Sequence, residues 1–226
     1  MAGAYLIGIL FMVISLAVSW RLKSKFKEYS QIGLASNLSG KEIAEKMLQD
    51  NRIYDVRVLS VEGSLTDHYN PADKTVNLSP EVYHGRSAAA AAVAAHECGH
   101  AVQHATAYTF LKFRSAMVPA LSIASRYMQW IILAGILMIN TTVIPLTIGV
   151  ALFALTTIFS FITLPVEFDA SRRALAWIDQ RGVVTSREHA MAKDALWWAA
   201  MTYVVAALGS LATLLYYVSL LMGRRD

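Results

Sequence analysis

The chain has 226 residues, of which 56% are hydrophobic, and a formal net charge of +4. Its mean hydropathy of +0.44 is too high for an ordinary soluble domain. The basic residues gather beside long uncharged runs, where they meet anionic lipid headgroups, rather than along a face that would bind nucleic acid. The single cysteine, Cys98, excludes an internal disulfide framework. We therefore expect an integral membrane protein that contacts the lipid bilayer and no nucleic acid.

Three runs of residues carry no charge, and their lengths predict four membrane-spanning helices. A helix needs about 20 apolar residues to cross a bilayer, so residues 1–20 provide one span and residues 195–223 contain another. The run over residues 127–166 is long enough for two spans, with a turn near Asn140 and Pro145. The expected spans are residues 1–20, 127–143, 147–166 and 196–221.

The positions of Lys and Arg predict which parts face the cytoplasm. No basic residue precedes the first span, whereas four basic residues follow it between positions 21 and 27, and cytoplasmic loops are rich in such residues. The first span is therefore expected to be an uncleaved anchor with its N-terminus outside. Residues 21–126 and 167–195 then lie in the cytoplasm, and Arg224 and Arg225 lie outside, against the same rule. We expect a multi-pass protein of the cell (inner) membrane.

The first cytoplasmic segment predicts a helix followed by a small sheet. Ser39 and Glu42 have the spacing of a capping box, and apolar residues follow at helical spacing, so a helix is expected from about residue 40 to residue 50. Short runs of strand-forming residues between turn signals then predict an antiparallel sheet, whose edge strand could hold an extended peptide. The expected strands are residues 56–61, 65–69 and 75–79.

An alanine-rich stretch carries the residues that point most directly to chemistry. Alanine is the best helix former, so the run from Ser87 to Gln103 is expected to be helical. His96 and His100 then lie on one face and can bind one metal ion, while Glu97 can reach a water in the open position of that ion. This is the H-E-x-x-H pattern of a zinc (Zn2+) site with a general base. A shuffled chain of this composition would contain it on the order of 0.005 times.

A catalytic zinc site needs a third protein ligand, and Glu167 is the favoured candidate. It follows the third expected span directly and is expected on the same side of the membrane as the motif. Asp169, two residues later on a helix, faces away from Glu167. His68 and His84 are the alternatives, as ligands or as hydrogen-bond donors in the cleft, although a lone His near a turn is more often a surface residue.

Several segments together resemble a known family. They are His-Tyr-Asn-Pro from residue 68, Leu-Ser-Pro-Glu-Val-Tyr-His-Gly-Arg-Ser from residue 78, Ala-Ala-His-Glu-Cys-Gly-His-Ala-Val-Gln from residue 94 and Leu-Pro-Val-Glu-Phe-Asp-Ala-Ser-Arg-Arg-Ala from residue 164. The chain resembles the YugP-type membrane zinc metallopeptidases of bacteria over most of its length. The resemblance implies a zinc-dependent neutral peptidase with His96, His100 and Glu167 as metal ligands and Glu97 as the catalytic residue.

The arrangement is also similar to the wider group of membrane gluzincins, which includes the CAAX-prenyl protease and heat-shock membrane protease families. Those proteins often carry an Asp four residues after the ligand Glu, where it orients a ligand His. Here that position is Ser171. Ser can accept the same hydrogen bond without the charge, and Asp169 or Asp67 is the alternative partner.

These residues predict a metalloprotease in which zinc activates a water and Glu97 takes its proton and passes it to the leaving amine. The donor to the oxyanion is left open among His68, Tyr108, Arg172 and His189. The expected substrate is a protein or peptide associated with the membrane. One alternative is a proteolytically silent zinc-binding scaffold or quality-control adaptor, which would need no base. Another is an ion transporter, which would need ionisable residues within its spans.

The expected fold class is a mainly α integral membrane protein. About four transmembrane helices are combined with a small α+β zincin-like domain, which is discontinuous in sequence. Residues 21–126 and 167–195 form that domain on the cytoplasmic side.

Overall fold

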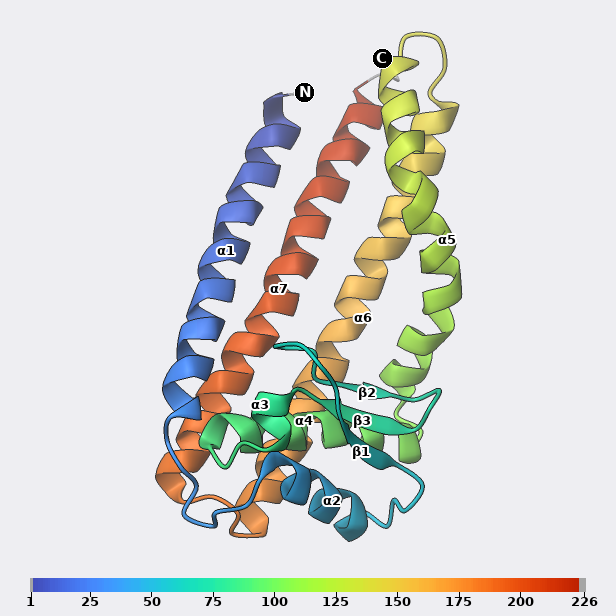
Figure 1. The fold of residues 1–226 in the computed structure, drawn as a ribbon. Helices are drawn as coiled ribbons and strands as arrows, with labels where there is room; N and C mark the ends of the chain where they lie inside the picture. The colour runs from blue at the N-terminus through green and yellow to red at the C-terminus, as the bar shows by residue number, and fades with distance from the viewer. Residues whose placement is uncertain (1, 224–226) are drawn as a thin grey trace. The chain divides into compact units, whose positions relative to one another are not determined.

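The computed structural model describes residues 2–223, and most of them are helical (Figure 1). Met1 and residues 224–226 lie outside the described residues, so the placement of Arg224 and Arg225 stays a prediction. The elements in chain order are α1 (Ala2–Ser30), α2 (Gly40–Asp50), β1 (Arg57–Ser60), β2 (His68–Asn70), β3 (Thr75–Leu78), α3 (Pro80–Tyr83), α4 (Ala88–Ala105), α5 (Thr109–Leu137), α6 (Ile144–Gln180) and α7 (Ser186–Met222).

The chain divides into two compact units, and the long helices contribute residues to both. All of the candidate site residues from the sequence belong to the second unit. The first unit comprises Met1–Ala17, Lys112–Leu164 and Thr202–Asp226, and the second comprises Val18–Leu111 and Pro165–Met201.

Within residues 2–223, four helices are long and apolar enough to cross a membrane, namely α1, α5, α6 and α7. The turn between α5 and α6 contains Asn140, as the sequence predicted. The helix that contains the second expected span, near residues 127–143, is α5, which begins before that span at Thr109 and ends at Leu137. Residues 127–137 alone would reach only about 17 Å, about half the thickness of the hydrocarbon core of a bilayer. The helix therefore has to extend back through Arg126.

Residues 167–195 are almost entirely helical, because α6 and α7 continue into this segment and leave only a short turn between them. Gly182 lies in that turn with φ at +60°, a conformation that glycine adopts without strain. The side chain of Glu188 accepts the backbone N–H of Ala35 at 2.8 Å. This bond ties the start of α7 to the loop that precedes α2.

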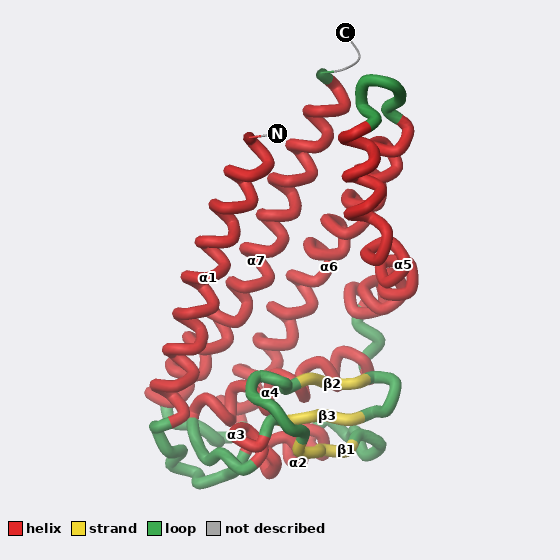
Figure 2. Tube along the Cα trace, turned by 45° about the horizontal axis from the view of Figure 1, so that its top comes forward, coloured by secondary structure: helices red, strands yellow, loops and turns green. Residues whose placement is uncertain are grey.

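The second unit contains a three-stranded sheet whose strand directions differ from the prediction (Figure 2). The order is β1-β3-β2, with β1 parallel and β2 antiparallel to β3. The expectation of a wholly antiparallel sheet is therefore wrong. Every residue of β3 is buried, whereas β1 and β2 both contain exposed residues. The strand that is buried on both faces takes the centre, and the other two become the edges.

The predicted helix over residues 40–50 is confirmed as α2, together with its capping box. Ser39 Oγ accepts the backbone N–H of Glu42 at 3.3 Å, and the Glu42 carboxylate accepts that of Ser39 at 2.8 Å. The buried face of α2 meets Cys98 of α4, whose thiol lies 3.5 Å from the carbonyl oxygen of Ala44. Burial raises the pKa of the Cys98 thiol, so this cysteine acts in packing and is not a reactive nucleophile.

Candidate metal centre

The helix α4 carries both histidines of the motif on one face. Its N-terminus is capped by Ser87, whose hydroxyl accepts the backbone N–H of Ala90 at 3.2 Å. The alanines that follow are almost completely buried, and their small side chains let the helix run through the core of the second unit. The rings of His96 and His100 meet edge to face with their centroids 4.8 Å apart.

Glu167 of α6 completes a cluster of three potential ligands. Its Oε2 lies 3.3 Å from His96 Nε2 and 3.6 Å from His100 Nε2. The three ligand atoms all lie within 4.8 Å of one another. Two ligands held by a tetrahedral zinc ion at its usual bond lengths are about 3.3 Å apart, so the donor set fits zinc. The buried carboxylate and the two imidazoles provide the mixed oxygen and nitrogen ligands that zinc accepts.

The two helices approach each other closely at Gly99, which lies between the histidines. A Cβ atom added to Gly99 would be 2.6 Å from the backbone carbonyl oxygen of Ala170. No side chain larger than hydrogen fits there without moving one of the helices. Because Ala170 is one helical turn after Glu167, this contact sets the distance between the carboxylate and the imidazoles.

The outer nitrogen of each imidazole is held by a hydrogen-bond acceptor. His96 Nδ1 lies 3.1 Å from Ser171 Oγ, and His100 Nδ1 lies 3.0 Å from Gln103 Oε1. An imidazole that donates its Nδ1 proton to such an oxygen keeps the lone pair of Nε2 for a metal. Both Nε2 atoms face Glu167, so the rings are oriented as ligands. Ser171 occupies the place that the sequence analysis considered for it.

Gln103 was missed in the sequence analysis, although it lies three residues after His100 on the same helix. Its side chain is completely buried. Its amide nitrogen donates to the carbonyl oxygen of Val166 at 2.7 Å and to Asp169 Oδ2 at 3.0 Å. Asp169 also pairs with Arg173 at 2.5 Å. Asp169 therefore reaches His100 through Gln103 rather than directly.

Replacing Gln103 with Met should weaken zinc binding by about 10- to 100-fold, because Met keeps the volume but removes the acceptor that orients His100. The dissociation constant, measured by competition with a zinc chelator in detergent, checks this. The matched control is Gln49→Met, at an exposed position of α2, which should bind zinc as the wild type does. Equal affinity in both variants would show that Gln103 does not position the ligand.

Two pKa shifts reflect the crowding of charges around the cluster. Burial opposes a charged imidazole at His100, but the hydrogen bond that His100 donates to the Glu167 carboxylate and the charge of Glu97 outweigh it, so the pKa of His100 is raised. At Asp67, by contrast, burial itself raises the pKa, although hydrogen bonds from Ser79 oppose the shift. Both groups feel the negative charge of Glu97, and a bound cation would relieve this concentration of charge.

Glu97 is buried beside the cluster and is connected to the sheet. Its Oε2 accepts the backbone N–H of Tyr69, in the edge strand β2, at 3.0 Å. The carboxylate therefore lies between the metal ligands on its own helix and the strand that forms the edge of the sheet. A general base needs this position if a substrate lies along that strand.

The remaining residues singled out from the sequence lie outside the cluster of three ligands. The His68 ring bonds locally, with Nδ1 2.7 Å from the carbonyl oxygen of Thr66 and Nε2 3.2 Å from the Asn77 amide. Arg172 pairs with Asp169 and its side chain is largely exposed. The His84 ring meets the ring of Tyr83 edge to face, and the Asp67 carboxylate accepts the backbone N–H of Ser79. The Tyr108 hydroxyl lies 3.5 Å from the carbonyl oxygen of Pro165. His189 lies on α7.

Comparison with known proteins assigns the chain to a family. The family described as "Putative neutral zinc metallopeptidase" matches residues 4–222. The chain belongs to this family. It is also 41% identical over 213 residues to the "Putative membrane protease YugP" of Bacillus subtilis (strain 168), and the match covers 94% of each chain. No solved structure gives a significant match. These two matches confirm the resemblance to the YugP-type zinc metallopeptidases that the sequence showed.

Proposed function

We propose that the protein is a membrane-embedded, zinc-dependent peptidase in which His96, His100 and Glu167 bind the metal. The observation that carries this proposal is the convergence of three ligand atoms from two helices, with an acceptor behind each imidazole. A purely structural zinc site fills all four positions with protein ligands, whereas a catalytic site leaves one open. The three-ligand set beside a buried Glu97 supports the catalytic alternative over a silent scaffold.

Glu97 is the proposed general base. Zinc bound in the cluster would act as a Lewis acid and lower the pKa of a water toward neutrality. Glu97 accepts a proton from that water as its oxygen bonds to the peptide carbonyl carbon, and then gives the proton to the nitrogen when the carbon–nitrogen bond breaks. The hydrogen bond from Tyr69 holds the carboxylate in place during both transfers.

The substrate is proposed to be a protein or peptide that binds in an extended form along β2. This strand is at an edge of the sheet, where a peptide can add as a further strand through backbone hydrogen bonds. The hydrogen bond from the Tyr69 backbone to Glu97 supports a substrate position close to the proposed base. A small sheet and a metal-binding helix in this relation support the zincin-like interpretation of the second unit.

The proposed location is the cell membrane, with the catalytic residues on the cytoplasmic side. The four candidate spans support a multi-pass arrangement. The basic residues after the first span and between the last two spans support the cytoplasmic side for both segments of the second unit. Substrates would then be membrane proteins, their cytoplasmic loops or damaged chains near the membrane surface.

Zinc content per chain tests the ligand set. Detergent-purified wild type should hold about one zinc, whereas Glu167→Ala and His100→Ala should lose most of it, because two ligands do not form a tight site. Elemental analysis after gel filtration provides the measurement. His84→Ala and Glu62→Ala change exposed residues of the same types and should keep their zinc. A Glu167→Ala protein that retained wild-type zinc would disprove this ligand assignment.

A further inference from the structure

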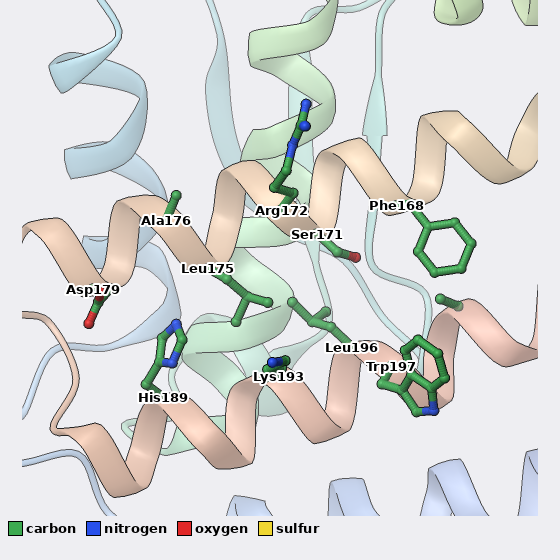
Figure 3. Close-up of a pocket in the computed structure, with 11 residues that line it drawn as sticks. Phe168, Ser171, Arg172, Leu175, Ala176, Asp179, His189, Lys193, Leu196 and Trp197 are labelled. Carbon is green, nitrogen blue, oxygen red and sulfur yellow. The ribbon is translucent and has the colours of Figure 1, made fainter.

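A cavity in the second unit lies outside the cluster of metal ligands. It has a volume of about 410 Å³ and lies between α6 and α7 (Figure 3), which is within the size range of small-molecule sites. We propose that this cavity binds a phospholipid whose headgroup carries a phosphate and a primary ammonium. The acyl chain would lie along the apolar part of the cavity, and the headgroup would lie at its polar end.

One end of the cavity presents exposed aromatic rings. Phe168 and Trp197 lie together there, with ring centroids 6.4 Å apart, and they are 39% and 54% exposed (Figure 3). Leu175 and Leu196 continue the apolar surface along the two helices. Trp197 belongs to an uncharged run of sequence, and Phe168 lies two residues after the end of another. Rings at such positions are typical of the membrane interface, where lipid covers them.

The other end of the cavity carries charges of both signs. Asp179 and His189 lie there, and Lys193 lies closer to the middle (Figure 3). Neither Asp179 nor Lys193 forms an ion pair with any residue that the structure describes. A primary ammonium could donate to the Asp179 carboxylate, while Lys193 and His189 could donate to a phosphate. Arg172 also lines the cavity, and its guanidinium pairs with Asp169.

The length of the cavity follows from the helix that lines it. The helical distance from Phe168 to Asp179 is about 17 Å. The apolar end adjoins the spans in sequence, and the charged end is farther from them. This orientation rests on the proposed cytoplasmic location of the second unit, since a headgroup would then face the cytoplasm.

A peptide fits the cavity less well than a lipid. An extended peptide would find no partners for its backbone, because both walls are helices whose own backbone groups are already bonded. An acyl chain has no such requirement.

Native mass spectrometry of the delipidated full-length protein in detergent tests the proposal. The protein is titrated with phosphatidylethanolamine, phosphatidylcholine or phosphatidylglycerol of identical chains. We expect phosphatidylethanolamine to bind about tenfold more tightly than the other two, the effect of one charge-assisted hydrogen bond. In Asp179→Asn this preference should vanish, and in Trp197→Ala all three lipids should bind more weakly. The same results are expected after zinc removal with EDTA, so the test is independent of peptidase activity.

Matched variants test which charged side chains bind the lipid headgroup. Glu62→Gln and Lys46→Gln change exposed charges away from the cavity and should bind lipids as the wild type does, whereas Lys193→Gln should weaken binding of all three. Equal affinity for the three lipids in the wild type, or an unchanged preference in Asp179→Asn, would overturn the proposal. It would also be overturned if a short apolar peptide displaced the bound lipid competitively.

Discussion

Replacing Glu97 with Gln is expected to leave zinc bound and to reduce peptide hydrolysis by about 10²- to 10⁴-fold, the usual contribution of a general base. Gln has the size of Glu, and its carbonyl oxygen can still accept the N–H of Tyr69 that holds the wild-type side chain. The neutral amide cannot take a proton from water. Hydrolysis of a casein-type substrate by purified protein, measured together with zinc per chain, separates the two effects.

The control for this variant is Glu81→Gln, which removes an exposed carboxylate outside the cluster and should hydrolyse the substrate at the wild-type rate. If Glu97→Gln were as active as the wild type, Glu97 would not be the base. If instead it lost zinc, Glu97 would be required for metal binding, and the division of roles between Glu97 and the three ligands would be wrong.

Replacing Gly99 with Ala should abolish tight zinc binding without touching any ligand. The added methyl group would lie 2.6 Å from the Ala170 carbonyl oxygen, about 0.8 Å short of the 3.4 Å of an ordinary contact. The helices would have to separate by a similar amount, and Glu167 would move with α6. Metal sites tolerate only about 0.2 Å of error in ligand distance, so zinc binding should fail.

The same substitution should also destabilise the protein by about 1–3 kcal/mol through overpacking. Thermal unfolding of the metal-free protein measures this effect separately from zinc loss. Gly8→Ala is the matched control, because no atom lies within 4 Å of the position that its Cβ would take, and alanine favours a helix. Wild-type zinc affinity in Gly99→Ala would show that the contact with Ala170 does not set the ligand spacing.

Much of the candidate site could be predicted because its signals are local. The spacing of His96 and His100 needs only the helical repeat, and the alanine run provides the helix. Glu167 is remote in sequence, yet few ionisable residues follow a span on the expected side of the membrane. The distribution of charges therefore predicted that Glu167 lies on the same side of the membrane as the motif. In the structure its carboxylate lies close to the two imidazoles.

The parts that could not be predicted depend on tertiary contacts. The central place of β3 follows from its burial on both faces, which four residues of mixed polarity do not indicate. The sequence leaves open whether the second span begins before Arg126, because this charge ends the apolar run, whereas α5 begins at Thr109. Gln103 resembles any polar helical residue, and its role appears only when Val166 and Asp169 lie beside it.

The continuity of α6 from a membrane span to Glu167 has a consequence for biosynthesis. The second histidine, His100, is made 67 residues before Glu167, an interval of roughly 3 to 13 seconds at about 5–20 residues per second. During that interval the growing chain has only two of the three proposed ligands. The ribosome must produce the third span before the third ligand exists, so a newly made chain acquires its full affinity for zinc only with that span. A chain terminated before that span would carry the complete H-E-x-x-H sequence and still lack a tight metal site.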